Sequence, residues 1–493
     1  MQKKIKEVLS LFSAGEIQSA LNSAKDLIKT FPNEEILFNI IGACYGSLGD
    51  HNAAVKNYEK AIIIKPDYAK AHFNLGGAFQ DIGQLSSSVK SYEKSIFVEP
   101  SYAEAHNNLG NVLRELGQLD SAISYYEKAL AINPKYIEAH YSLGSIYEEI
   151  GQLNSAVKCY EKVLVIKPEF SKMHNNLGVI LQNQGQLNDA VKHLEEAITL
   201  SPDFAEAHNN LGNIHKDLND YDAAINCYEI AISINSNYAE AHFNLGILLK
   251  HIGHHEDAVK NLEAAVSIKA NYGEAFHLLN ALTGKTTKSP PKEYVEKLFD
   301  HYADGFDGSL VEQLQYKLPF LIKELINKAA PSLSKFNNVI DLGCGTGLAG
   351  QELKGISNTL TGIDLSNKMI IKAKERQIYD HLITGDISEA LNNTTEKYDL
   401  FVALDVLIYI GEVSSIFKAI RNCCNQSAIF IFSIEVQTDG DYSLLKTGRY
   451  SHSVDYILRN SSDRFKLLAS QEVKLRKDNE KWISGNIICL QAS

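Results

Sequence analysis

The chain contains 493 residues, a length that favours about two to four domains over a single core. Its 45% hydrophobic and 22% charged residues are typical of a soluble globular protein. With 60 acidic against 48 basic side chains, the formal net charge is −12. Because surfaces that bind phosphate are usually basic, this balance argues against nucleic acid as the main partner.

The seven cysteines are scattered along the chain, and none belongs to a C-x-x-C pair. The sequence therefore predicts neither a metal site nor a disulfide framework, and reduced thiols are typical of the cytoplasm. No segment reaches the roughly 18 apolar residues that a membrane span needs. We expect a cytoplasmic protein without a membrane span.

The first half of the chain is periodic. The block A-H-x-N-L-G returns every 34 residues, with its glycine at Gly76, Gly110, Gly144, Gly178, Gly212 and Gly246. A ladder of alanine or serine and a ladder of tyrosine or leucine share this period, and prolines close the repeats up to Pro202. These positions predict two amphipathic helices per unit. The units must stack, because one helix pair cannot bury its apolar face alone.

This pattern closely resembles the tetratricopeptide repeat. We expect a solenoid over residues 1–283, with a degenerate cap at 1–34, seven repeats over 35–272 and a closing helix at 273–283. The recurrent histidines, such as His106, are expected to pack rather than to bind metal, because only one stands in each repeat.

An asparagine precedes the Leu-Gly pair in most repeats, and the resemblance places it on the concave face of the solenoid. An amide both donates and accepts, so this ladder suits the backbone of an extended protein or peptide partner. The alternative is an asparagine with structural hydrogen bonds only. Glu138 and Glu240 argue against the two-lysine carboxylate clamp of some relatives and favour a cationic peptide. The predicted groove residues are Asn74, Asn108, Asn176, Asn210 and Asn244.

Residues 284–292 interrupt the period with two prolines and three lysines, and they predict a short extended linker. Beyond them, short β-branched runs alternate with helical stretches. This alternation predicts a mostly parallel sheet with both faces covered by helices.

Glycines and aspartates stand at the ends of the predicted strands. The first strand continues into D-L-G-C-G-T-G at 341–347, where glycine permits a tight turn and lets a ligand approach the backbone. A dinucleotide fold prefers G-x-G-x-x-G, and this register fails at Leu348. Acids follow the next three strands as Asp364, Asp386 and Asp405. Each aspartate alone has the alternative role of a helix N-cap, but ligands of open α/β sheets bind where all four segments converge.

These motifs resemble class I S-adenosylmethionine-dependent methyltransferases over residues 293–493, and a bacterial group that joins repeats to such a domain. The resemblance implies a seven-stranded Rossmann-like fold that ends in an antiparallel hairpin of 465–475 and 485–491. It also implies S-adenosylmethionine as cofactor, with the three aspartates toward the ribose, the adenine amino group and the methionine end. The residues expected to bind the cofactor are Asp341, Gly343, Cys344, Gly345, Gly347, Asp364, Leu365, Asp386, Ile387, Asp405 and Tyr302.

Two further segments carry candidate site residues. Tyr302 or Phe306 is expected to cover the cofactor, with core packing as the alternative. Between the fifth and sixth strands, G-R-Y-S-H-S at 448–453 lies where this fold builds its acceptor pocket. We expect Arg449 and His452 to contact substrate there, Arg449 through an anionic group; the alternative is a solvated loop. The candidates for a general base are Tyr409, His452 and Tyr456.

The leading interpretation is a methyltransferase whose repeats bind a protein or peptide and recruit a substrate or partner. One alternative is a small-molecule or lipid methyltransferase that uses its repeats only for complex assembly. Another is a non-catalytic repeat scaffold with a vestigial cofactor fold, against which the intact glycine loop and the three aspartates argue.

Overall fold

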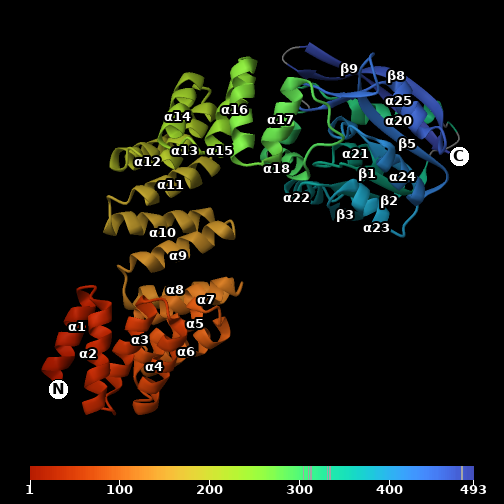
Figure 1. Cartoon of the computed structure of the whole chain (residues 1–493). Coiled ribbons are helices and arrows are strands. Elements are labelled where there is room, and N and C mark those ends of the chain that lie inside the picture. Colours follow the sequence, from red (N-terminus) through yellow and green to blue (C-terminus); the bar gives the residue numbers. More distant parts are fainter. Residues whose placement is uncertain (304, 309, 311–313, 330, 332–334, 479–480) are drawn as a thin grey trace. The chain divides into compact units, whose positions relative to one another are not determined.

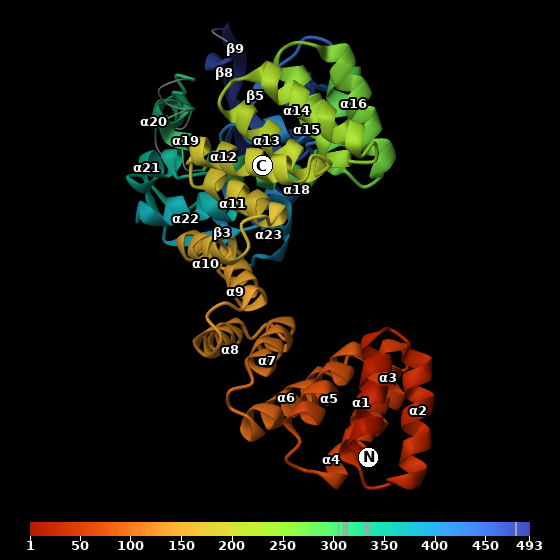
Figure 2. The ribbon, with the colours of Figure 1, turned by 90° about the vertical axis from the view of Figure 1, so that its left-hand side faces the viewer.

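The computed structural model describes residues 1–303, 305–308, 310, 314–329, 331, 335–478 and 481–493. The chain forms two compact units, Met1–Ile234 and Asn235–Ser493 (Figures 1 and 2). The predicted fold class is confirmed, since repeat helices are followed in the chain by an α/β domain. The domain boundaries at 283 and 293 stay predictions, and the second compact unit already begins within the repeats.

The first unit is built of helix pairs that follow one another along the repeats (Figure 2). A glycine in the left-handed conformation, for example Gly117 with φ of 71°, ends the first helix of most pairs. The helices are α1 (Gln2–Ser13), α2 (Ile17–Thr30), α3 (Glu35–Ser47), α4 (His51–Ile64), α5 (Ala69–Asp81), α6 (Leu85–Val98), α7 (Ala103–Glu115), α8 (Leu119–Ile132), α9 (Ile137–Glu149), α10 (Leu153–Ile166), α11 (Ser171–Asn183), α12 (Leu187–Leu200), α13 (Ala205–Asp217) and α14 (Tyr221–Ile234).

The glycine in the first helix of a repeat makes room for a large side chain of the second helix. A Cβ atom built on Gly76 would lie 2.8 Å from the ring of Tyr92, and one on Gly178 would lie 2.6 Å from Cγ of Leu194. Both large side chains are buried. The 34-residue spacing of these glycines in the sequence therefore reflects one packing contact that is repeated in each repeat.

The recurrent histidines hold the turn between repeats. The Nε2 atom of each lies 2.9–3.0 Å from the carbonyl oxygen of the proline six residues earlier, in the pairs His72–Pro66, His106–Pro100, His140–Pro134, His174–Pro168 and His208–Pro202. A carbonyl can only accept, so Nε2 donates. Within the described part of the chain, no group of three or more histidine, cysteine or acidic side chains is arranged to hold a metal ion.

The second unit starts with α15 (Ala239–His251), α16 (His255–Ile268) and α17 (Gly273–Thr283), and a segment without helix or strand follows at 284–291. Its strands are β1 (Phe336–Leu342), β2 (Ser357–Asp364), β3 (His381–Thr384), β4 (Tyr398–Ala403), β5 (Cys424–Val436), β6 (Tyr442–Leu444), β7 (Tyr450–His452), β8 (Phe465–Asp478) and β9 (Lys481–Ala492).

Strands β3-β2-β1-β4-β5 are parallel neighbours in this order, and β1 pairs Val339 with Leu360 of β2 and with Leu400 of β4. On the other side of β5, β9 and then β8 add antiparallel. These seven strands make the predicted sheet and its final hairpin. In addition, β6 and β7 form a small hairpin, which pairs with the end of β5 through Glu435 and Ser451.

Helices cover both faces of the sheet. Alternate residues of β5 point to opposite faces, so Phe430 and Phe432 belong to one apolar core and Ile429 and Ile431 to the other. None of the described helices has the length and apolarity needed to cross a bilayer. The remaining elements are α18 (Lys292–Tyr302), α19 (Phe306–Gly308), α20 (Leu318–Ala329), α21 (Leu348–Lys354), α22 (Asn367–Glu375), α23 (Ile387–Asn393), the 3₁₀ helix Leu407–Tyr409, α24 (Ser414–Cys423) and α25 (Val454–Ser461).

Candidate functional site

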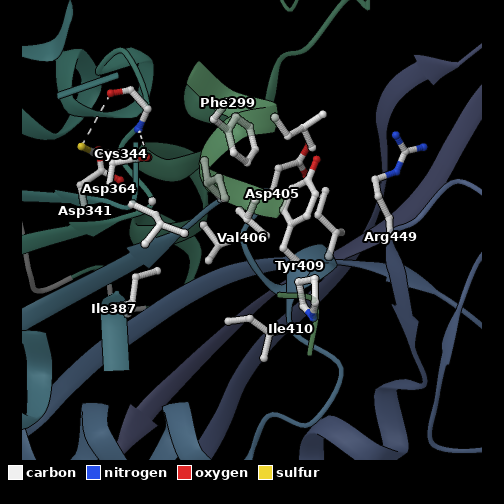
Figure 3. Close-up of a pocket in the computed structure, with 18 of the residues that line it drawn as sticks. Phe299, Asp341, Cys344, Asp364, Ile387, Asp405, Val406, Tyr409, Ile410 and Arg449 are labelled. Atoms are coloured by element: carbon white, nitrogen blue, oxygen red, sulfur yellow. Dashed lines mark hydrogen bonds between the residues drawn. The ribbon is translucent and has the colours of Figure 1, made fainter. Parts of the chain in front are cut away.

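A cavity of about 710 Å³ lies at the carboxyl ends of β1, β2, β3 and β4 (Figure 3). Sites that enclose a small ligand usually measure roughly 300–1,000 Å³, so this cavity can hold a cofactor together with a small acceptor or with part of a larger one. Figure 3 shows Asp364 and the glycine loop on one side, Arg449 on the other, and Phe299 and Tyr409 between them.

The glycine loop brings bare backbone to the cavity. Gly343 has φ of 67°, and a Cβ atom there would lie 2.5 Å from Cγ2 of Val406. A Cβ atom on Gly345 would contact the ring of Phe306 at 3.6 Å. Cys344, Gly343 and Gly345 line the cavity. Gly347 is not among its lining residues; it has φ of 94° and begins α21.

Asp341 lies under the glycine loop and is 2% exposed. Its Oδ2 atom accepts a hydrogen bond of 2.7 Å from the hydroxyl of Tyr379. Burial raises the pKa of Asp341 to about 7, although the hydrogen bond from Tyr379 acts in the opposite direction. This carboxyl group therefore titrates near neutral pH.

Asp364, at the end of β2, ties the glycine loop to the next helix. Its Oδ2 atom accepts from the backbone N–H of Gly345 at 2.8 Å, and its Oδ1 atom accepts from Ser366 at 2.9 Å. Burial raises the pKa of Asp364, while these backbone hydrogen bonds lower it. The backbone N–H of Leu365 is a third donor to this carboxylate. A carboxylate has about four lone pairs, so one remains for a ligand in the cavity, which Asp364 and Leu365 both line.

Asp386 and Ile387 lie at the end of β3, and both line the cavity. The side chain of Asp386 accepts from the backbone N–H of Glu389 at 3.0 Å and so caps α23. The N-cap role, which was the alternative for each aspartate, is therefore present here. Capping occupies one lone pair, so it does not prevent the other oxygen from binding a ligand.

A cluster of four charged side chains closes the far side of the cavity. Asp405, which follows β4 with φ of 56°, forms an ion pair with Arg476 of β8, and Arg476 also pairs with Glu435 of β5. The Nε atom of Arg449 lies 3.0 Å from Oε1 of Glu435. Burial alone would lower the pKa of Arg476, but the carboxylates of Asp405 and Glu435 outweigh burial and raise it. The cluster is thus two guanidinium groups balanced by two carboxylates.

Aromatic side chains run along the cavity between its two sides. The ring centroid of Phe299 lies 6.2 Å from that of Phe306 and 5.2 Å from that of Tyr409. Tyr302 also lines the cavity and is half exposed. Burial raises the pKa of Tyr409 to about 12, with the nearby arginines acting in the opposite direction, so its hydroxyl is protonated at neutral pH. Asp304, in the same aromatic segment, lies outside the described residues.

His452 and Tyr456 do not reach the cavity. His452 is fully buried in β7, where its Nε2 atom lies 3.1 Å from the carbonyl oxygen of Gly411 and its ring stacks on that of Tyr456. The hydroxyl of Tyr456 accepts from the backbone N–H of Val413 at 3.3 Å. Within the described G-R-Y-S-H-S segment, only Arg449 lines the cavity. The expected substrate contact of His452 is thus corrected, because pleating of β7 turns this side chain into the wall behind the site.

Arg476 and Glu435 were missed by the sequence analysis, although both bear on the candidate site. For Glu435 a signal existed, since a lone acid ends the apolar run S-A-I-F-I-F-S-I-E. Arg476 lies in β8 between the buried Leu475 and the half-buried Lys477, and no motif in its neighbours marks it.

The predicted groove asparagines are all half-buried, four in the first unit and Asn244 in the second. Asn74 donates to Asn39 at 3.0 Å and Asn210 donates to Asn175 at 2.9 Å, each across to the preceding repeat. The alternative, a structural hydrogen-bonding role, is therefore present for these two, and Asn108 also accepts a hydrogen bond of 3.2 Å from Asn107. Asn74 and Asn108 also line a hollow of about 160 Å³.

Comparison with known families agrees with the two parts of the chain. Residues 340–432 match a family model described as a methyltransferase domain. Tetratricopeptide-repeat models match residues 42–83, 110–151, 137–170, 183–219, 212–253 and 239–272. The chain therefore carries tetratricopeptide repeats and a methyltransferase domain.

Several curated methyltransferases are similar to part of this chain. The ubiquinone biosynthesis O-methyltransferase of Glaesserella parasuis is 23% identical over 24% of this chain and 52% of its own length. An 18S rRNA (guanine-N(7))-methyltransferase of Arabidopsis thaliana is 23% identical over 26% and 47%. A malonyl-[acyl-carrier protein] O-methyltransferase of Buchnera aphidicola is 24% identical over 31% and 58%. The chain spans about half the length of these relatives, and their names point to different acceptors.

Proposed function

We propose that this chain, with its tetratricopeptide repeats and methyltransferase domain, is an S-adenosylmethionine-dependent methyltransferase whose repeats recruit a protein or peptide as substrate or partner. The observation that carries the proposal is the single cavity that joins the glycine loop, Asp364 and Asp386 on one side to Tyr409 and Arg449 on the other. The seven cysteines of the chain are buried and form no disulfide, which supports a location in the reducing cytoplasm.

The residues at the glycine-loop side fit the cofactor. Gly343 and Gly345 leave backbone uncovered, and the oxygens of Asp364 and Asp386 retain acceptor capacity for hydroxyl and amino groups. The faces of Phe299, Tyr302 and Phe306 suit a positively charged sulfur. When bound, S-adenosylmethionine supplies a methyl carbon activated by that sulfur.

The other side of the cavity fits an acceptor that needs orientation more than proton removal. Tyr409 keeps its proton at neutral pH, so its hydroxyl donates or accepts a hydrogen bond without serving as a ready base. Arg449 suits an anionic group of the acceptor and is held from behind by Glu435. Orientation of the reacting groups contributes up to about 7–11 kcal/mol to well-aligned reactions.

The repeats are proposed to bind an extended segment through their half-buried asparagines. The hollow beside Asn74 and Asn108 also contains Asp81, and an acid there favours a cationic segment. The first alternative remains a small-molecule or lipid acceptor, with the repeats used only for assembly. The cavity volume favours this alternative, because it would enclose a whole small acceptor beside the cofactor.

Calorimetric titration of S-adenosylmethionine into the full chain tests the cofactor. We expect micromolar binding that weakens at least tenfold in Asp364→Asn, because the amide removes one charged acceptor from the cavity. Asp399→Asn is the matched control, since Asp399 also accepts two backbone N–H bonds but lies away from the cavity. If the folded wild-type chain does not bind, the enzyme proposal fails and a repeat scaffold remains.

Incubation of the full chain with tritiated S-adenosylmethionine and cell lysate tests the acceptor and the repeats. Label in a protein, reduced in Asn108→Ala, would support recruitment of the acceptor by the repeats. Label in small molecules, equal in wild type and Asn108→Ala, would favour the first alternative instead.

A further inference from the structure

The last helix of the repeat array, α17, is covered by the methyltransferase domain where another repeat would stack. In the repeats, Phe73 and Phe243 meet the ring of the tyrosine that ends their own repeat and caps the next helix, with centroid distances of 4.9 Å to Tyr102 and 4.7 Å to Tyr272. His277 occupies the corresponding position of α17. Its ring meets Tyr294 of α18 at 4.8 Å.

The hairpin of β6 and β7 completes this cover. Ala281 of α17 forms a small apolar cluster with Leu444 of β6 and Tyr450 of β7, and all three side chains are buried. A solenoid needs a cap on its last helix, because that helix otherwise exposes the face that would meet the next repeat. The hairpin, which is additional to the seven-stranded sheet, supplies this cap.

The segment at 284–291 is also held against the methyltransferase domain by hydrogen bonds. The backbone oxygen of Lys288 accepts from the N–H groups of Gly411 and Glu412 at 3.0 and 2.8 Å. The hydroxyl of Thr287 lies 2.6 Å from that of Tyr450. Lys288 also lines the cavity, so the chain that leaves the repeats forms part of its wall.

The contact between α17 and the hairpin is centred on the turn that carries Arg449. Nε2 of His277 donates to the carbonyl oxygen of Gly448 at 2.9 Å, and His277 is 1% exposed. Gly448 has φ of 89°, and a Cβ atom there would lie 3.0 Å from the hydroxyl of Tyr294. The turn is closed by Leu445 N–H, which donates to the carbonyl of Arg449 at 2.8 Å. A shift of Gly448 would therefore move the next residue, Arg449, in the cavity.

We infer that α17 supports the acceptor side of the cavity from outside, and that His277 is a positioning residue that sets where the Arg449 guanidinium lies in the cavity. The role of Arg449 toward the acceptor rests on the proposed function, whereas the control of this turn by His277 does not. The repeat array and the acceptor side of the cavity then share one structural element. A fragment that begins at residue 285 would lack it.

Three variants of the full chain test the inference. His277→Leu removes the donor, His277→Gln keeps a donor of similar reach, and His106→Leu is the control because His106 makes the same kind of buried bond, to Pro100, within the repeats. Hydrogen exchange at the amides of Leu445 and Gly448 reports on the turn. We expect at least tenfold faster exchange there in His277→Leu, wild-type exchange in His277→Gln, and no change at this turn in His106→Leu.

Kinetics with the acceptor found by tritium labelling supply the second readout. His277→Leu is expected to raise the KM for the acceptor about tenfold, with a smaller change in kcat and an unchanged Kd for S-adenosylmethionine, and His277→Gln should restore the KM. Unchanged exchange in His277→Leu, or accelerated exchange with an unchanged KM, would overturn the inference. If the wild-type chain transfers no methyl group, the proposed function fails, while the exchange experiment still decides whether His277 holds the turn.

Discussion

The two compact units are held by contacts that span different distances along the chain. In the first unit, Gly76 meets Tyr92 of the same repeat, and an equivalent contact returns in the following repeats. In the second unit, Arg476 pairs with Asp405 and Glu435, which lie 71 and 41 residues away. The array is thus held by many short-range contacts of one kind, and the candidate site by a few long-range contacts that occur once.

This difference predicts how each unit responds to a single change. The stability of a repeat array is approximately a sum over repeats and their interfaces, so one lost contact has a limited effect. In the second unit one buried guanidinium group pairs with two carboxylates, so its loss affects the whole cluster. Trp482 in β9 is the only tryptophan of the sequence, and its fluorescence therefore reports on the second unit alone.

The largest effect is expected for Arg476→Met. The variant leaves Asp405 and Glu435 buried without their shared partner, which should cost about 3–5 kcal/mol in the free energy of unfolding. Urea denaturation followed by Trp482 fluorescence measures it. Lys466→Met, at an exposed position of the same strand, is the control and should unfold as the wild type does. Equal midpoints for the two variants would show that the cluster does not stabilise the unit.

A smaller effect, which depends on pH, is expected for Asp341→Asn. Burial raises the pKa of Asp341 from 3.8 to about 7, so its neutral form stabilises the fold at low pH, and this contribution is lost as pH rises through 7. Between pH 5 and 8 the wild-type second unit should lose roughly 2–3 kcal/mol that the asparagine variant retains. Urea midpoints by Trp482 fluorescence at each pH measure the difference. Asp399→Asn should follow the wild-type profile, and parallel profiles for wild type and Asp341→Asn would contradict the raised pKa.

In the array, Gly42→Ala and Gly46→Ala form a matched pair on α3. A Cβ atom on Gly42 would lie 2.6 Å from the ring of Tyr58, whereas one on Gly46 has no atom within 4 Å. The first change should therefore destabilise by about 1–3 kcal/mol through overpacking. The second should stabilise by up to about 1 kcal/mol, because alanine favours the helix. Circular dichroism at the helix band measures both, and a loss of stability in Gly46→Ala would refute the packing argument.

The smallest effect is expected for Lys29→Met in α2. Lys29 forms an ion pair of 2.8 Å with Asp26, but both side chains are largely exposed. Water screens such a pair, so the urea midpoint by circular dichroism should not change measurably. A loss comparable to that of Arg476→Met would remove the distinction between the two units.

The repeats were the part most fully predictable from sequence. The contacts of one repeat recur in the others between residues of the same types. The residues that form them, such as Gly76 with Tyr92 and His72 with Pro66, therefore recur in the sequence every 34 residues. The cofactor side of the candidate site was predictable for a related reason. Asp364 and Asp386 end neighbouring parallel strands, and the carboxyl ends of such strands meet at one edge.

The acceptor side was less predictable, because it is assembled from segments with no common pattern. Arg449 lines the cavity, but His452 lies on a strand whose pleat turns it into the interior. No local motif connects His277 of the repeats with Gly448, although they are hydrogen-bonded across 171 residues.

The sequence by itself determined the repeat period, the order of the seven strands of the main sheet, and the edge of the sheet where a ligand is expected, because these follow from local propensity, spacing and strand direction. It did not predict the hairpin of β6 and β7. Only the tertiary structure decided which charges neutralise one another behind the cavity and that α17 is capped by the hairpin carrying Arg449. Such pairings depend on distances through space between residues far apart in the chain, and a linear pattern does not encode those distances.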